Sequence, residues 1–264
     1  MMPSIHSCDL SLVCPAFNEA ENLTPLVAEW NGVLRATGQT YEMIIVDDAS
    51  DDATPAVLRA AVQDHSRLRV LRMSRRGGQS AALAAGFAAA RGRWFVTSDA
   101  DLQNDPADLP KLLELAGEFD LICGWRKDRQ DSWTKRLTSL LANARRRKLL
   151  DDGVHDTGCG LKVFRREIAT RILHFDGMHR FLPALAKIEG FTVTEVPVHH
   201  RPRVRGASKY WIFNRFRKPI ADLRGVAWYR SRHLAAAAHE ITASEVTERT
   251  TEPVAVTPPR AQAC

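Results

Sequence analysis

Short apolar runs alternate with amphipathic stretches along the first 125 residues. The runs are continuous in aliphatic and aromatic residues, which is typical of strands buried on both faces. They occupy residues 10–14, 43–47, 68–72, 94–98 and 121–124. Between them, two segments suit the start of a helix: Asp52-Ala-Thr-Pro55, and Asp105-Pro106, after which the helix is expected to run towards Glu118. The alternation predicts an α/β fold, with a mostly parallel sheet and helices on both of its faces.

The pattern changes after residue 131. A basic helical stretch at 132–150 precedes a glycine-rich segment at 156–160, a strand at 161–164, a helix from Arg165 and a strand at 192–198. Beyond His239 the chain is rich in Thr, Glu, Pro and Ala, a composition that predicts disorder. We therefore expect a main domain at residues 1–208, basic amphipathic helices at 209–235 and a disordered tail at 236–264.

Composition narrows the class of protein. Of the 264 residues, 45% are hydrophobic and 26% charged, the balance of a soluble globular protein. No run approaches the roughly 20 apolar residues that span a bilayer, and the N-terminus does not have the pattern of a secretory signal. Five scattered cysteines favour the reducing cytoplasm over a disulfide scaffold.

Basic residues concentrate in the second half of a chain whose net charge is +6. Residues 201–232 contain ten Lys or Arg and one acid, Asp222. Such an excess points to a polyanionic partner, which is a nucleic acid, a phosphorylated substrate or an anionic membrane surface.

Two carboxylates follow the fourth predicted strand. Asp99 and Asp101 are two residues apart, so on an extended chain both face the same side. Ligands of parallel sheets bind at the carboxyl ends of the strands, and like charges at that spacing favour a cation between them. Mg²⁺ or Mn²⁺ fits their oxygen ligands. The alternative is a solvated pair that caps the next helix.

The other strand ends carry weaker signals. The first strand runs into Pro15, Phe17, Asn18 and Glu19, and the second into residues 47–51, with three aspartates. These groups could bind a ribose or a nucleobase, although Asn18 and a serine at position 50 would equally serve as helix caps.

A glycine pair opens the third helix. Gly77 and Gly78 precede a helix of small residues at 80–90, which suits a phosphate at its N-terminus or close packing on the sheet. The pair matches neither the dinucleotide-binding fingerprint nor a P-loop. A nicotinamide dehydrogenase and a P-loop NTPase are both disfavoured.

Taken together and in this order, these motifs resemble family 2 glycosyltransferases of the GT-A fold, and among them the polyprenyl-phosphate glycosyltransferases. The resemblance covers roughly residues 10–210. Its motifs are Pro-Ala-Phe-Asn-Glu at 15–19, Val-Asp-Asp-Ala-Ser-Asp at 46–51, Asp-Ala-Asp-Leu-Gln at 99–103, Gly-Trp-Arg at 124–126, Asp-Thr-Gly-Cys-Gly-Leu-Lys at 156–162 and Arg-Val-Arg-Gly-Ala-Ser-Lys at 203–209.

The resemblance implies a role for individual residues. It assigns the nucleotide to Pro15, Phe17, Glu19, Asp48 and Gln79. It assigns a divalent cation to Asp99, Asp101 and Gln103. It assigns the acceptor phosphate to Arg126, Lys135 or Arg136, Ser139, Arg203, Ser208 and Lys209, and counts Arg126, Arg203 and Lys209 with the two aspartates as the catalytic set. The sequence departs from the family's pattern at two places. Phe17 replaces the usual tyrosine. The loop between Arg126 and Trp133 is short, so the exact contacts with the acceptor are not implied by the resemblance.

The implied reaction is an inverting, metal-dependent transfer of a hexose from a GDP- or UDP-linked sugar to a polyprenyl phosphate. A phosphate monoester has a second pKa of about 6, so the nucleophile is largely ionised at neutral pH and needs positioning rather than a general base. Asp156 is then an orienting group or a cap more than a base, and His199 and His200 are expected to be surface residues. A saccharide acceptor or a non-catalytic basic module are the alternatives.

A lipid acceptor implies contact with a membrane. Residues 210–218 and again 221–230 combine aromatic side chains with Lys and Arg. They suit helices at the interface of an anionic leaflet, or helices packed on the domain itself. We expect a peripheral protein at the inner face of the membrane, or one with a membrane-embedded partner subunit. We do not expect a nucleic acid as a partner.

Overall fold

A single seven-stranded sheet organises the chain. The computed structural model describes residues 7–127, 146, 149–202 and 217–234. The strands stand in the order β3-β2-β1-β4-β6-β5-β7. Their bounds are β1 Cys8–Ala16, β2 Tyr41–Asp47, β3 Leu68–Arg72, β4 Gly92–Thr97, β5 Leu121–Trp125, β6 Lys162–Arg165 and β7 Val193–Pro197.

The sheet is parallel except at one strand. β1 pairs in parallel with β2 and β4, β2 with β3, and β5 with β7. β6 runs antiparallel to both β4 and β5. The prediction of a mostly parallel sheet is confirmed, and a strand lies at each of the seven predicted positions. Because β6 is reversed, it starts at the edge of the sheet where β4 and β5 end, and the residues directly before it lie at that edge.

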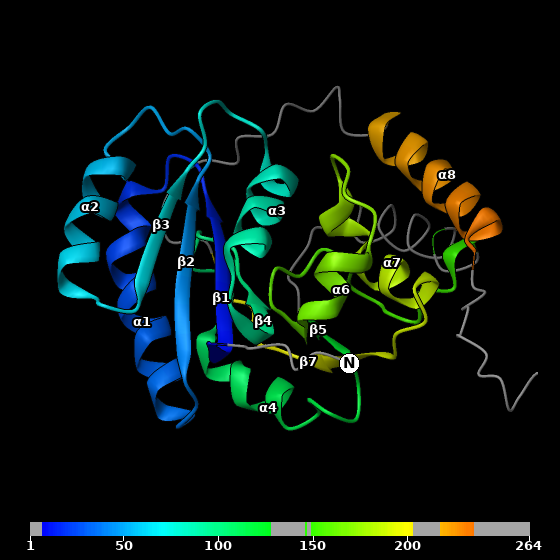
Figure 1. Ribbon diagram of the computed structural model, residues 1–264, viewed down its shortest axis with the longest axis horizontal. Helices are drawn as coiled ribbons and strands as arrows, with labels where there is room; N and C mark the ends of the chain where they lie inside the picture. The colour runs from blue at the N-terminus through cyan, green and yellow to red at the C-terminus, as the bar shows by residue number, and fades with distance from the viewer. Residues whose placement is uncertain (1–6, 128–145, 147–148, 203–216, 235–264) are drawn as a thin grey trace, which may run out of the picture. The chain divides into compact units, whose positions relative to one another are not determined.

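Helices cover both faces, as predicted (Figure 1). One buried cluster joins the sheet to α1, α2 and α4, through side chains such as Trp30, Leu58 and Leu109. The other joins it to α3, α6 and α7, through side chains such as Phe87 and Ile168. The bounds are α1 Ala20–Ala36, α2 Thr54–Asp64, α3 Gln79–Ala89, α4 Leu109–Leu113, α6 Arg166–Arg171, α7 Leu182–Ile188 and α8 Arg217–Arg232.

The helix after Asp105 is shorter than predicted. A 3₁₀ turn at Pro106–Asp108 leads into α4, which ends at Leu113 instead of running towards Glu118. Ala116 and Phe119 form an isolated bridge around Gly117, whose φ of 108° a right-handed helix does not allow. The pairing of these two residues overrides the helical pattern.

α8 covers the second of the two predicted C-terminal amphipathic stretches. Val226 on its inner side is buried in the same cluster as α3 and α7, and the hydroxyl of Tyr229 donates to Glu189 Oε1 at 2.7 Å. Residues 210–216 and the predicted tail at 236–264 lie outside the described residues, and the domain boundaries remain predictions. Within the described helices, none combines the length and apolar character that crossing a bilayer requires.

Close packing of α3 on the sheet depends on Gly86. A Cβ built there would lie 2.3 Å from Cγ1 of Val13 and 3.2 Å from Cγ2 of Val46. We predict that Gly86→Ala lowers the free energy of unfolding by about 1–3 kcal/mol, because overpacking forces the strands and the helix apart. Urea unfolding measures this.

The matched control is Gly32→Ala in α1, where an added Cβ meets no atom within 4 Å. That variant should match the wild type or gain up to about 1 kcal/mol from helix propensity. Equal stability of the Gly86 and Gly32 variants would contradict the packing argument.

Candidate functional site

Three loops at one edge of the sheet adopt the left-handed conformation without glycine. Asn18 after β1, Ala49 after β2 and Leu102 after β4 have φ values of 55°, 57° and 61°. Such residues persist only where surrounding contacts hold them, and they cluster at functional sites. The predicted nucleotide and cation motifs lie in these three loops.

Asp48 connects the loop after β2 with the start of α3. Its two carboxylate oxygens accept the backbone N–H groups of Gly77 and Gly78 at 2.7 and 2.8 Å. The Arg76 guanidinium, next in the chain, lies 4.0 Å from the centre of the Phe17 ring. The structure therefore brings together Phe17 and Asp48, both predicted for the nucleotide, and adds Arg76, which the sequence reasoning missed.

Pro15 and Glu19 flank the loop after β1. Pro15 pairs with Val46 across the β1–β2 ladder. Glu19 donates its backbone N–H to Thr54 Oγ1 at 2.9 Å and accepts the side-chain amide of Asn22 at 2.6 Å. These contacts tie the loop to the starts of α1 and α2, beside the Asp48 loop.

Three residues from different segments pack closely around Asp99. Gln79 Nε2 donates to Asp99 Oδ1 at 2.9 Å, so Gln79 stands beside the acidic pair. Asn104, which is buried, accepts the Asp99 backbone N–H at 3.1 Å. A Cβ at Gly160 would lie 2.4 Å from Asp99 Oδ2, so only glycine allows this approach. The sequence reasoning missed Asn104, although an amide directly after Gln103 was the available signal.

Asp101 and Gln103 complete the loop after β4. Gln103 donates its backbone N–H to Asp101 Oδ1 at 3.2 Å, and its side-chain nitrogen lies 3.5 Å from Nε2 of His200. His200 therefore contacts a predicted cation ligand, which its predicted surface role did not include. His199 is exposed as predicted and lies 3.0 Å from Asp108 through Nδ1.

The oxygen donors of this loop fit a hard divalent cation such as Mg²⁺ or Mn²⁺. Burial, followed by the negative charges of Asp99, Asp101 and Glu19, raises the pKa of the Cys14 thiol well above its usual range. In the described part of the chain, no three His, Cys, Asp or Glu side chains are grouped to hold a metal. Asp99, Asp101 and Gln103 would thus supply only part of a coordination shell, as for cations shared with substrate phosphates.

Arg126 and Asp156 form a bidentate pair beside this loop. Nε and Nη2 of Arg126 lie 2.6 and 2.9 Å from the two oxygens of Asp156. Burial disfavours both charges, but the pairing outweighs it: the pKa of Asp156 is held below its usual range and the pKa of Arg126 is raised. A carboxylate ionised and engaged in this way orients Arg126, which is the role favoured from the sequence.

Polar groups lie buried beneath the site on the α3 side. The Lys162 ammonium donates to the Cys159 carbonyl, and Ser80 Oγ lies 2.7 Å from Nδ1 of His179. Burial, then the charges of Arg180 and Lys162, lowers the pKa of His179 to about 3, so this imidazole is neutral at physiological pH. Lys162 ends the motif at 156–162 but was given no role from the sequence, and His179 lies outside every motif.

Six residues assigned to the acceptor phosphate lie outside the described residues. They are Lys135, Arg136, Ser139, Arg203, Ser208 and Lys209. Of the predicted acceptor set, Arg126 is the member that the structure places.

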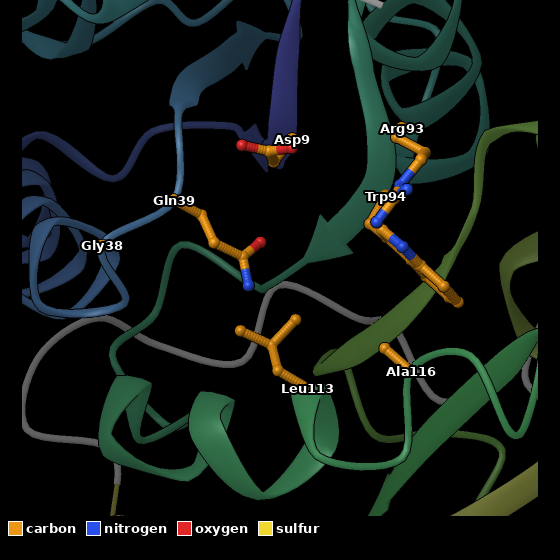
Figure 2. Close-up of a pocket in the computed structure, with 7 residues that line it drawn as sticks. All are labelled: Asp9, Gly38, Gln39, Arg93, Trp94, Leu113 and Ala116. Carbon is orange, nitrogen blue, oxygen red and sulfur yellow. The ribbon is translucent and has the colours of Figure 1, made fainter.

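A cavity of about 380 Å³ lies at the opposite edge of the sheet. Figure 2 shows its lining, in which Asp9 near the start of β1 and Arg93 near the start of β4 face the side chains of α4 and the turn after it. Ligands of parallel sheets bind at the other ends of the strands. The acidic edge is therefore the candidate site.

Comparison with known proteins decides the family. The sequence profile of glycosyl transferase family 2 matches residues 11–173, from within β1 to beyond β6, and so includes the acidic loop. This chain belongs to glycosyl transferase family 2. The family 2 glycosyltransferase predicted from the motifs is confirmed.

Two curated relatives of this glycosyltransferase are named for polyprenyl phosphates. Dodecaprenyl-phosphate galacturonate synthase of Rhizobium johnstonii is 38% identical over 231 residues, covering 85% of this chain and 68% of the relative. Undecaprenyl-phosphate 4-deoxy-4-formamido-L-arabinose transferase of Edwardsiella ictaluri is 36% identical over 203 residues, covering 76% of this chain. The chain spans 62% of that second relative, less than two thirds of its length.

Solved structures confirm the GT-A fold of this glycosyltransferase. Glucosyl-3-phosphoglycerate synthase from Mycobacterium tuberculosis, crystallised with Mn²⁺, UDP and phosphoglyceric acid, matches with a TM-score of 0.64 at 20% identity. That match covers 85% of this chain and 79% of the other. The same enzyme with Mn²⁺, UDP-glucose and glycerol 3-phosphate matches with a TM-score of 0.62 at 19% identity, covering 84% and 80%.

The Arg126–Asp156 pair gives a pH-dependent prediction. Because the folded-state pKa of Asp156 is depressed, its stabilisation is complete above the unfolded-state pKa of about 3.9 and is lost as pH falls through the folded-state pKa. We predict that Asp156→Asn lowers the free energy of unfolding by about 3 kcal/mol at pH 7, since Arg126 loses a mostly buried partner. Urea unfolding at several pH values measures this deficit, which should shrink below pH 4.

Asp151→Asn is the matched control. The Asp151 carboxylate is 78% exposed and lies 3.8 Å from Arg230, so its loss should change stability by less than about 0.5 kcal/mol. A deficit for Asp156→Asn that stayed constant down to pH 3 would show that charge pairing is not its cause.

Proposed function

We propose that this chain transfers a hexose from a nucleotide sugar to a polyprenyl phosphate, with inversion at the anomeric carbon and with the help of Mg²⁺ or Mn²⁺. One observation carries the proposal: the acidic loop after β4 and the paired Arg126 guanidinium share one edge of the sheet. The named activities of two relatives at 38% and 36% identity support the lipid acceptor.

The donor side rests on Phe17, Asp48 and the acidic loop. The Phe17 ring and the Asp48 carboxylate offer a flat apolar surface and hydrogen-bond acceptors for a nucleoside. Asp99, Asp101 and Gln103 would hold the cation, which when bound neutralises the diphosphate of the leaving nucleotide. Gln79 donates to Asp99 Oδ1 and would limit the rotation of this carboxylate.

The acceptor side rests on Arg126. Asp156 engages Nε and Nη2, which fixes the plane of the guanidinium and leaves its Nη1 side to meet a phosphate oxygen. A lipid phosphate is largely a dianion at neutral pH, so attack on the anomeric carbon requires no proton transfer to the protein. The contribution of Arg126 is to orient the nucleophile and reduce its repulsion from the donor.

The transfer reaction gives the direct test. Purified protein is incubated with radiolabelled UDP- and GDP-sugars, polyprenyl phosphate and Mg²⁺ or Mn²⁺, and the organic phase is counted. We expect label in the lipid phase with at least one donor, and a loss of 100-fold or more in Asp101→Asn, since a cation ligand is removed.

Asp64→Asn, at the exposed end of α2, is the matched control and should retain full activity. Label that never enters the lipid phase with any donor would refute the proposal, and label in a saccharide instead would move the acceptor to another class. Full activity of Asp101→Asn would refute the cation assignment alone.

We also propose that α8 attaches the protein to the surface of a membrane. Arg224, Trp228 and Arg232 are exposed and stand one turn apart, with Trp228 66% exposed. Ile220, one turn earlier, is 52% exposed. An aromatic residue between two arginines suits the boundary between headgroups and acyl chains.

Cosedimentation with vesicles tests this attachment. With phosphatidylglycerol and phosphatidylcholine vesicles, we expect Trp228→Ser to weaken binding several-fold, and Arg224→Gln to weaken it about fivefold, from roughly 1 kcal/mol per basic residue. Leu173→Ser, a similarly exposed apolar position at 47%, should bind like the wild type. Equal binding by all variants would contradict a role for α8.

A further inference from the structure

The chain directly after β7 runs along the acidic loop. Asn104 and His200 form an antiparallel bridge. The backbone N–H of Arg201 donates to the Gln103 carbonyl at 3.0 Å, and Gln103 Nε2 donates to the Arg201 carbonyl at 3.4 Å. Residues 199–201, which we call the strap, are therefore hydrogen-bonded to the loop that contains Asp99, Asp101 and Gln103.

Carboxylates from two other elements hold the strap in place. The Arg201 guanidinium reaches Glu29 of α1 at 2.6 Å and Asp105 at 2.8 Å, one nitrogen to each. Asp105 in turn accepts the backbone N–H of Ala107 at the start of the 3₁₀ turn. His199 donates its backbone N–H to the buried Asp108 at 2.7 Å. The strap thus joins α1 to both ends of the segment that follows the acidic loop.

The backbone of the acidic loop needs such support. Leu102, between Asp101 and Gln103, has a φ of 61°, a left-handed conformation that residues other than glycine keep only where surrounding contacts hold them. Contacts from outside the loop are what can keep this geometry before a cation binds.

We propose that Arg201 is a positioning residue for the cation site, which it acts on by holding the strap against the Asp99–Gln103 loop. The proposal rests on the proposed function for the identity of the site. It assigns Arg201 no contact with the cation or the substrates. Its guanidinium is suited to this task because it binds two separate carboxylates at once, which a lysine ammonium on a flexible stem does less well.

Binding of Mn²⁺ to the full chain provides the test. Free Mn²⁺ is titrated by electron paramagnetic resonance in the presence of UDP or GDP, alongside the melting temperature and the dependence of transfer rate on Mn²⁺. We expect Arg201→Gln to weaken Mn²⁺ binding about tenfold, the low end of the effect of residues that support metal ligands. Arg201→Lys should restore part of the affinity, and kcat at saturating Mn²⁺ should change much less than the Mn²⁺ requirement.

Arg171→Gln is the matched control. Arg171 is a half-exposed arginine 3.7 Å from Glu189, far along the chain from the acidic loop. Its substitution should leave Mn²⁺ binding unchanged. If Arg201→Gln does not fold, Asp105→Asn removes only the loop-side anchor, and it should weaken Mn²⁺ binding while Glu29→Gln, on α1, has a smaller effect.

The outcomes separate this proposal from the proposed function. Mn²⁺ affinity equal to wild type in folded Arg201→Gln or Asp105→Asn would overturn the positioning role, whatever happens to activity. A wild-type protein that binds no Mn²⁺ would overturn it as well. Weaker Mn²⁺ binding in the Arg201 variants, in a wild type that transfers no sugar to lipid, would uphold the positioning role and refute the proposed function.

Discussion

Negative charge gathered at one edge of the sheet is the constraint on which the rest of the structure depends. Carboxylates follow the parallel strands β1, β2 and β4, and Asp156 adds another at the start of the glycine-rich segment before β6. At such separations like charges repel unless each has donors or a cation nearby. The structure supplies donors one carboxylate at a time: backbone N–H groups for Asp48, an amide for Asp99 and a guanidinium for Asp156.

The reversed strand β6 makes this arrangement possible. Because it enters the sheet from the ligand edge, the turn before it lies directly against β4, where Thr97 Oγ1 donates to the Gly160 carbonyl at 2.7 Å. The same turn brings Asp156 to Arg126 at the end of β5. A fully parallel sheet would have placed that turn at the other edge. The reversed direction of this one strand thus places the acidic loop and the Arg126–Asp156 pair at the same edge of the sheet.

The sheet and most of the acidic edge could be predicted from the sequence, since a strand buried on both faces must be continuously apolar and its carboxyl end is where polar residues resume. The positions of Asp99, Asp101 and Arg126 at the ends of β4 and β5 were predicted in this way or through their motifs. The length of the helix after Pro106 could not be predicted, because a bridge between Ala116 and Phe119 competes with a pattern that is locally helical. Arg76, Asn104 and His200 were missed as partners because their roles come from contacts with other loops.

The sequence by itself determined which residue types stand at each strand end, and therefore the chemistry available at the edge: oxygen ligands, a glycine turn and basic groups. Only the tertiary structure decided how these groups are paired. Asp156 engages Arg126 across 30 positions of the chain, and Arg201 reaches Glu29 across 172. Hydrophobic periodicity predicts burial because whether a side chain is buried depends on its own polarity and its place in a strand or helix. Pairing depends on distances between segments, which no local pattern specifies.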